Sequence, residues 1–327
     1  MNVSKIEFGL LLHTRHLIRE DRGPDAVGEL WEAAGQAEAA GFDHLWLGDS
    51  PRISPLDRAH ADCLTIMAAL AARTSKIRIG TVPLIVALRN PVLLAHTLAT
   101  LDVISSGRLL LGVSVAPQYK FAEHEFEACG VPFKQRAGRL EETIRVMRRL
   151  WTEESFSFEG KYFRFREIGI QPKPIQRPIP IWIAAGDNDN ALKRVARLGD
   201  GWFTVAPTME KFAARRKKID LSAREAGRDA KNIPAALFAT FHLHTDAKKA
   251  EEEGWTLAES YYCQPRTQLA HLSPFFDTPE ACARKLRTYV DVGLTSVVAR
   301  FVSPDVAGQT RLLLNEVRPR LKLGEKQ

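Results

Sequence analysis

The sequence predicts an α/β fold, a (β/α)8 TIM barrel, and three observations carry this prediction. Short apolar runs alternate with helical patterns eight times along the 327 residues. No shift in composition and no long linker divides the chain, so we expect one domain over residues 1–327. Eight strand–helix units in about 320 residues is the size of such a barrel. A doubly wound sheet is the alternative, but the glycine-rich GxGxxG turn usual after its first strand is absent here.

The expected elements follow from apolar periodicity and from the residues that end helices. Strands are predicted at 6–12, 44–48, 77–86, 108–115, 179–185, 202–205, 236–244 and 296–302. Helices are predicted at 24–40, 63–73, 91–105, 136–151, 209–226, 279–293 and 304–321, with one more between Asn188 and Gly199. A surface hairpin is expected at 156–165. Residues 246–276 are polar and mixed, and they predict helical pieces, inserted between the seventh and eighth strands, that cover one end of the fold.

Composition excludes several classes of protein. No run of eighteen apolar residues predicts a membrane span, and the first residues lack the design of a signal peptide. The cysteines are scattered without a CxxC pair, which favours a reduced, cytoplasmic protein: Cys63, Cys129, Cys263 and Cys282. The net charge is +7, but the basic clusters at 136–149 and 215–218 alternate with acids and predict solvated helix faces. We therefore expect no nucleic-acid partner, and a preference for anionic cofactors or substrates.

The stretch 178–203 reads as a strand, a tight turn and a helix. Gly186 permits a sharp turn, and Asn188 or Asp189 can cap the helix that follows. A helix N-terminus at the carboxyl end of a strand presents free N–H groups and the positive end of the helix dipole. The stretch predicts either a cofactor phosphate site or an ordinary strand–helix turn.

In a barrel the active site lies at the carboxyl ends of the strands, which selects candidate residues. These are His13, Asp49, Ser50, 82–84, Arg89, 115–119, 185–188, Ala206, His242, His244 and Arg300. His242 and His244 lie on one side of a strand and could bind zinc, contact substrate or only pack. Further metal ligands are missing at later strand ends, so no metal is predicted. Arg300 needs a partner when buried, either an acid such as Asp49 or an anionic group.

Five ordered segments, at 37–50, 74–113, 130–151, 158–163 and 178–203, resemble the bacterial-luciferase-like flavin-dependent oxidoreductases. The resemblance runs in order over residues 6–206 and is looser beyond them. It implies a TIM barrel that binds FMN, or the deazaflavin coenzyme F420, at the strand carboxyl ends. Relatives with FMN use oxygen and take reduced flavin from a separate reductase, whereas relatives with the deazaflavin transfer hydride.

The resemblance also implies site residues. The flavin ring lies against a cis-peptide bulge after the third strand, which corresponds to Val82–Pro83, and an acidic residue beside the ring corresponds to Asp49. The phosphate turn corresponds to Ala185, Gly186, Asp187 and Asn188, where two aspartates, Asp187 and Asp189, bring negative charge near the proposed phosphate. After the fourth strand the segment beginning at Val115 lacks the glycine pair or arginine usual in relatives, although Val115 is still assigned to the cofactor site.

We expect an FMN-dependent monooxygenase that uses reduced flavin and O2 on a small organic substrate. Catalytic roles are assigned to His13, Asp49, His242 and Arg300. The alternative is an F420-dependent hydride-transfer enzyme on the same fold. Two distant alternatives are a metal-dependent hydrolase and a flavin-binding barrel without catalysis. The expected partners are the substrate, a separate reductase that delivers reduced flavin, and a second copy of the chain in a homodimer.

Overall fold

The computed structural model describes residues 5–14, 25–50, 61–116, 118, 120–206, 208–269 and 272–321. The fold is the predicted TIM barrel, with flanking helices around a parallel sheet. The strand order is β10-β9-β11-β1-β2-β3-β4-β7-β8, and β9 also pairs with β8. Eight of these strands are the ones the sequence predicts, and β10 is an additional strand.

The barrel strands are β1 (Glu7–Leu11), β2 (His44–Leu47), β3 (Arg78–Thr81), β4 (Leu109–Val113), β7 (Ile181–Ala184), β8 (Gly201–Thr204), β9 (Ala235–Leu243) and β11 (Ser296–Phe301). The helices are α1 (Asp25–Ala40), α2 (Cys63–Arg73), α3 (Pro91–Ile104), α4 (Lys120–Ala128), α5 (Arg136–Thr152), α6 (Asp189–Leu198), α7 (Met209–Glu225), α8 (Ala247–Tyr262), α9 (Pro279–Asp291) and α10 (Val306–Leu312). The predicted hairpin is β5 (Phe156–Glu159) and β6 (Arg164–Ile168). Among the described residues, no helix is long and apolar enough to cross a membrane.

Three predictions of elements need correction. The third strand ends at Thr81 rather than 86, because the chain bends at Val82 and rejoins the sheet only through an isolated bridge at Leu84, before a 3-10 turn, η1 (Val86–Leu88). Helix α4 was not predicted. The mixed segment 246–276 contains one long helix, α8, and then β10 (Pro274–Asp277), which pairs in parallel with β9.

The chain divides into two compact units. The first unit comprises Met1–Leu11, Gln36–Leu45 and Ala185–Gln327, and the second comprises Leu12–Gly35 and Trp46–Ala184. We describe each unit by itself.

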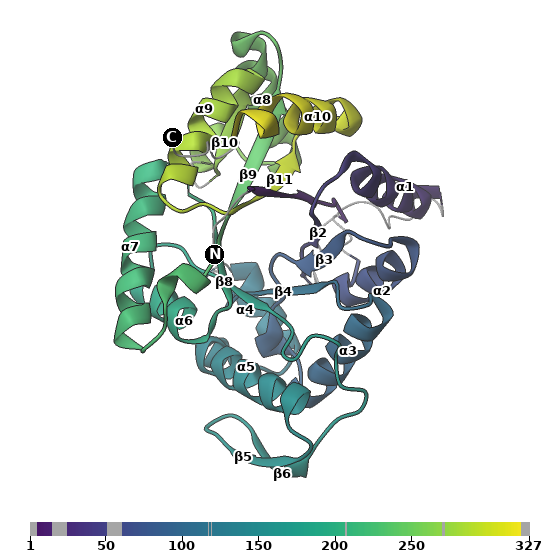
Figure 1. The fold of residues 1–327 in the computed structure, drawn as a ribbon, viewed down its shortest axis with the longest axis vertical. Coiled ribbons are helices and arrows are strands. Elements are labelled where there is room, and N and C mark those ends of the chain that lie inside the picture. Colours follow the sequence, from purple (N-terminus) through teal and green to yellow (C-terminus); the bar gives the residue numbers. More distant parts are fainter. Residues whose placement is uncertain are drawn as a thin grey trace. The chain divides into compact units, whose positions relative to one another are not determined.

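In the second unit, α2 and α3 lie beside β3 and β4 (Figure 1), and both helices begin at capping side chains. Asp62 accepts from Thr65 N at 2.9 Å to begin α2, and Asn90 caps α3, which has a proline in its first turn. Gly80 lets the Trp46 ring approach its backbone, since a Cβ there would lie 2.5 Å from that ring. This core holds the ends of β2, β3 and β4 in fixed positions.

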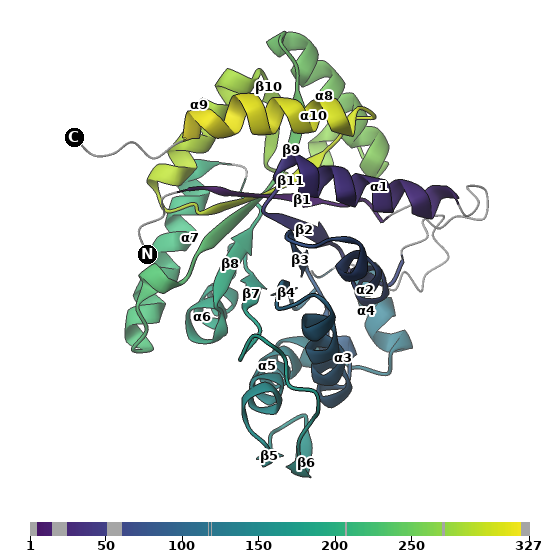
Figure 2. The ribbon, with the colours of Figure 1, turned by 45° about the vertical axis from the view of Figure 1, so that its right-hand side comes forward.

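In the first unit, large aromatic side chains fill the space between β8–β10 and the helices. Trp202 and Phe212 pack with ring centroids 4.9 Å apart, and Phe212 contacts Tyr289 of α9 at 5.7 Å. Figures 1 and 2 show α8, α9 and α10 grouped around β9, β10 and β11. Burial of such rings stabilises this unit.

Candidate active site

Asp49, just past the end of β2, is the most tightly held carboxylate of the predicted site. Its side chain is 3% exposed and receives two hydrogen bonds from Arg89, at 2.8 and 2.9 Å. The backbone N–H of Ile85 donates to the same carboxylate at 3.0 Å. Burial would lower the pKa of Arg89, but the hydrogen bonds and charge of Asp49 outweigh it and raise that pKa. The pair therefore ties the end of β2 to the segment after β3.

Two neighbours extend this cluster. The thiol of Cys63 donates to Asp49 at 3.5 Å, and burial together with the Asp49 charge raises the pKa of Cys63. Ser50 donates to the buried Glu125 of α4 at 2.6 Å. Glu125 was not among the predicted site residues, because nothing in its local sequence shows that α4 buries this side chain.

The segment after β3 has the conformation that the family resemblance implies. The Val82–Pro83 peptide is cis, as predicted, with Val82 buried and Pro83 half-buried. Leu84 rejoins the sheet by donating to the Gly112 carbonyl at 2.7 Å. After β4, Val115 is half-buried, and the next residue, Ala116, has a left-handed φ of 64°.

The predicted phosphate turn lies between β7 and α6. Ala185 is buried, and its carbonyl accepts from the Trp202 indole at 3.0 Å. Asn188 caps α6 by accepting from Ala191 N at 3.0 Å. Gly186, Asp187 and Asn188 are exposed, and within the described chain their backbone N–H groups have no hydrogen-bond acceptor. The turn thus presents three donors at a helix N-terminus.

The two aspartates of this turn are both paired with cations of α7. Arg215 donates to Asp187 at 2.8 Å, and Lys218 donates to Asp189 at 2.7 Å. These hydrogen bonds lower the pKa of each carboxyl group. The pairs offset the negative charge that the sequence places beside the proposed phosphate.

The prediction that 215–218 is a solvated helix face is wrong for Arg215. Its side chain is 7% exposed, and besides Asp187 it donates to Thr204 Oγ1 at 2.8 Å and to the Val205 carbonyl at 2.6 Å. Helical periodicity does not reveal this burial, because the long apolar stem of an arginine can cross a helix–sheet contact while its head reaches the strand end.

The histidines differ in environment. His242 is buried on β9, with Nδ1 3.1 Å from the Val302 carbonyl and Nε2 3.1 Å from the Glu253 carboxylate. His244 is half-buried and accepts at Nδ1 from Asp246 N at 2.9 Å. His13 lies half-buried two residues past β1. Glu253 was not predicted for the site, because it lies in the mixed segment 246–276, whose sequence did not show where a helix begins or ends.

The charge of Asp49 is balanced by Arg89, and Arg300 has partners of its own within the first unit. The guanidinium of Arg300 is buried, donates to the Tyr262 and Thr240 hydroxyls, and lies 5.1 Å from the Phe238 ring centroid. The rings of Tyr262 and Tyr261 lie at 4.9 and 5.7 Å. Hydroxyl acceptors and aromatic faces thus surround this cation.

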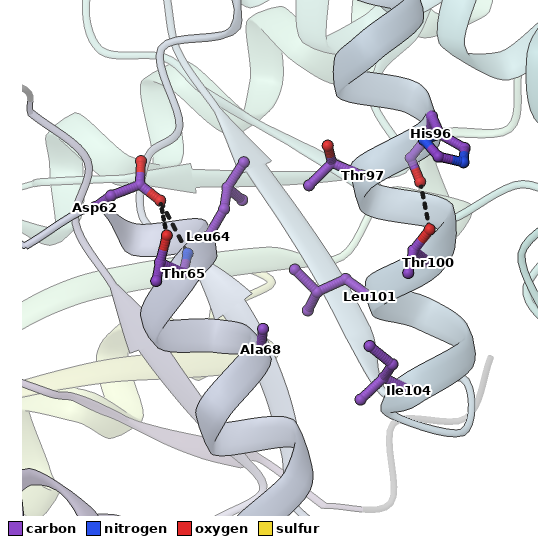
Figure 3. Close-up of a pocket in the computed structure, with 9 residues that line it drawn as sticks. All are labelled: Asp62, Leu64, Thr65, Ala68, His96, Thr97, Thr100, Leu101 and Ile104. Carbon is purple, nitrogen blue, oxygen red and sulfur yellow. Dashed lines mark hydrogen bonds between the residues drawn. The ribbon is translucent and has the colours of Figure 1, made fainter.

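A groove of about 540 Å³ lies between α2 and α3 (Figure 3). Its lining residues are Asp62, Leu64, Thr65, Ala68, His96, Thr97, Thr100, Leu101 and Ile104. None of them was predicted for the site. The groove runs between two helices, and its lining residue Asp62 lies 3.6 Å from Arg89, the partner of Asp49.

Among the described residues, no group of three or more His, Cys, Asp or Glu side chains is placed to hold a metal ion. Within the first unit a strand end carries a turn whose N–H groups have no acceptor in the described chain, and within the second unit another carries a cis-peptide bulge beside a buried carboxylate. Such features at strand ends are typical of barrel enzymes that bind an organic cofactor.

Comparisons with known proteins agree with that class. The family model described as luciferase-like monooxygenase matches residues 6–275, and the chain belongs to this family. The chain is 29% identical to the F420-dependent glucose-6-phosphate dehydrogenase of Kineococcus radiotolerans over 299 residues, which cover 84% of this chain and 87% of that relative.

Solved structures show the same fold. An F420-dependent secondary alcohol dehydrogenase superposes with a TM-score of 0.80 at 22% identity, covering 98% of this chain and 100% of that one. The monooxygenase RslO1 from Streptomyces bottropensis superposes with a TM-score of 0.78 at 23% identity, covering 96% and 99%. The names of the relatives do not support FMN as the first choice of cofactor, which corrects that prediction, and they favour the deazaflavin alternative.

Proposed function

We propose that this protein is an F420-dependent oxidoreductase that transfers hydride between the deazaflavin and a small hydroxylated substrate. The chain aligns over most of its length with relatives named F420-dependent glucose-6-phosphate dehydrogenase. A solved structure of the same fold is named as a secondary alcohol dehydrogenase that uses F420. Both names describe oxidation of a hydroxyl-bearing carbon, which is the reaction class we assign here.

The turn at Gly186–Asn188 is the observation that carries the cofactor assignment. Its three residues are exposed, and their backbone N–H groups have no acceptor within the described residues. A Cβ added to Gly186 would meet no atom within 4 Å, so space for a ligand lies beside the turn. With Asp187 paired to Arg215, the turn suits a phosphate group.

We assign Asp49 a positioning role rather than proton transfer. Arg89 and Ile85 donate to both of its carboxylate oxygens, so the group is already occupied as an acceptor. It fixes the backbone just after Val82 and Pro83. We propose that Val82, Pro83 and Val115 lie against the cofactor ring. His13 remains a proposed substrate contact.

When bound, F420 supplies a carbon that accepts or gives up hydride. The chain supplies the binding turn for its phosphate and the supported bulge for its ring. This function needs neither O2 nor a flavin reductase. The homodimer and the cytoplasmic location remain proposals.

Binding titrations test the assignment. We expect F420 to bind the protein, followed by its fluorescence, at micromolar concentration or below, and FMN to bind at least tenfold more weakly. Reduction of F420 would then be measured with a panel of alcohols that includes glucose 6-phosphate and 2-propanol. Tighter binding of FMN, with no reduction of F420 by any alcohol, would contradict the proposal.

A further inference from the structure

His242 of β9 is buried and pairs with the half-exposed Glu253 of α8. The cofactor assignment uses neither residue. We propose that Glu253 is the base that takes the hydroxyl proton of the substrate, and that His242 positions and polarises it. This inference rests on the proposed function, because a hydroxyl must lose its proton when its carbon gives up hydride.

The side of β9 on which His242 lies follows from the alternation of side chains. Phe241 stacks on Phe275 at 5.0 Å, and Phe275 in turn contacts Tyr289 of α9 at 6.3 Å, so Phe241 faces α9. His242 therefore faces the opposite side of β9, the side on which Phe276 packs against α8, one residue before the end of the strand. This is the end of the strand at which barrel enzymes place their chemistry.

The close packing of α8 explains why Glu253 reaches this end. Gly254 lies against Phe276 of β10, where an added Cβ would be 2.6 Å from the ring. Trp255 packs edge-on against the same ring at 5.2 Å. With α8 held at this distance, Glu253 Oε2 lies 3.1 Å from His242 Nε2.

The hydrogen bonds of His242 set its protonation pattern. A backbone carbonyl only accepts, so Nδ1 carries a proton and donates to Val302. Nε2 lies 3.1 Å from Glu253 Oε2, so a hydrogen bond at the second ring nitrogen orients the Glu253 carboxylate.

Glu253 has the remaining properties of a base. Its side chain is 53% exposed, and within the described residues Oε1 has no hydrogen-bond partner. Oε1 can therefore accept the substrate proton, and water can later remove it. In the balanced step, the hydroxyl proton would go to Glu253 and the hydride of the hydroxyl-bearing carbon would go to the cofactor. The alcohol would thereby become a carbonyl compound.

Neighbouring acids on α8 differ in the partner they have. Glu252 lies 3.9 Å from Lys248, and Glu251 pairs with Arg266 at 2.7 Å, both at exposed positions. Glu253 instead faces a buried imidazole. Glu252→Gln is therefore a matched control that removes one carboxylate from the same helix without touching His242.

The test compares wild type with Glu253→Gln, Glu253→Ala and Glu252→Gln. For Glu253→Gln we expect kcat with the best alcohol of the panel to fall about 100-fold or more, as for loss of a general base. The dissociation constant of F420 should stay within threefold of wild type. Added formate should restore part of the lost rate to Glu253→Ala, because it returns a carboxylate to the vacated space. The Glu252→Gln variant should match wild type.

Nitrogen-15 NMR of the histidine rings gives a readout that needs no cofactor, with His242 assigned by a His242→Gln variant. We expect the Nε2 signal of His242 to shift in Glu253→Gln, because this nitrogen loses its carboxylate partner. Turnover of Glu253→Gln within threefold of wild type, or a ring unchanged by that substitution, would overturn the inference while leaving the proposed function intact. Failure of wild type to bind or reduce F420 would instead overturn the proposed function.

Discussion

Asp49→Asn tests whether the Asp49–Arg89 pair holds the site together. Breaking a buried ion pair by neutralising one partner costs about 3–5 kcal/mol. Arg89 is 23% exposed, and asparagine keeps one oxygen that can accept a hydrogen bond, so we take the low end. We expect the free energy of unfolding to fall by about 3 kcal/mol, measured by urea denaturation.

Glu159→Gln is the control for this experiment. Glu159 and Arg164 form a 2.8 Å ion pair in which both side chains are 76% exposed, so water screens their attraction. Its loss should cost less than about 0.5 kcal/mol. If Asp49→Asn is no more destabilising than Glu159→Gln, then the pair does not organise this end of the barrel and our account of Asp49 is wrong.

Three other predictions concern single side chains. Gly186→Ala should leave thermal stability unchanged, because the added methyl group meets no atom. It should weaken F420 binding about tenfold, or ~1.4 kcal/mol, because the methyl group occupies the ligand's space. Equal affinity of the variant and wild type in a titration would remove the phosphate assignment. Arg215 lowers the pKa of Asp187, so the stability this pair adds is present above pH of about 4 and lost as pH falls through the lowered pKa. Asp187→Asn should thus be less stable than wild type by under about 1 kcal/mol at neutral pH, a gap that closes in acid; a gap that persists in acid would show another cause. A thiol reagent should label the exposed Cys129 and Cys263 in the native protein before the two buried cysteines, and simultaneous labelling of all four would contradict the described burial.

Local patterns were enough to predict the barrel. Each of its eight strands is an apolar run, and several helices begin at a capping residue that is visible in the sequence, such as Asn90 before Pro91. Asn188 also has the capping role that its position predicts. These signals depend on residues within one turn of each other, so one sequence contains them.

Long-range contacts could not be predicted in the same way. Arg215 lies in a basic run that resembles a solvated face, and only the packing of α7 shows that its head group reaches Asp187. Arg300 was expected to pair with an acid such as Asp49 or with an anionic group, but tyrosines of α8 lie around it, and the sequence gives no sign of where α8 lies. Such pairings depend on tertiary packing between segments far apart in the chain.

The choice between FMN and F420 was also beyond the local sequence. Both cofactors need a phosphate turn and a supported ring, and the residues of this chain offer those features to either. The names of relatives along most of the chain decide which cofactor is proposed.

Tracing deuterium from the substrate tests the central claim most directly. An alcohol labelled with deuterium at its carbinol carbon would be incubated with the protein and oxidised F420, while oxygen uptake is recorded. We predict that the label appears in reduced F420, that the alcohol becomes a carbonyl compound and that no oxygen is consumed. Oxygen uptake with reduced FMN, together with no transfer of deuterium to F420, would contradict the account.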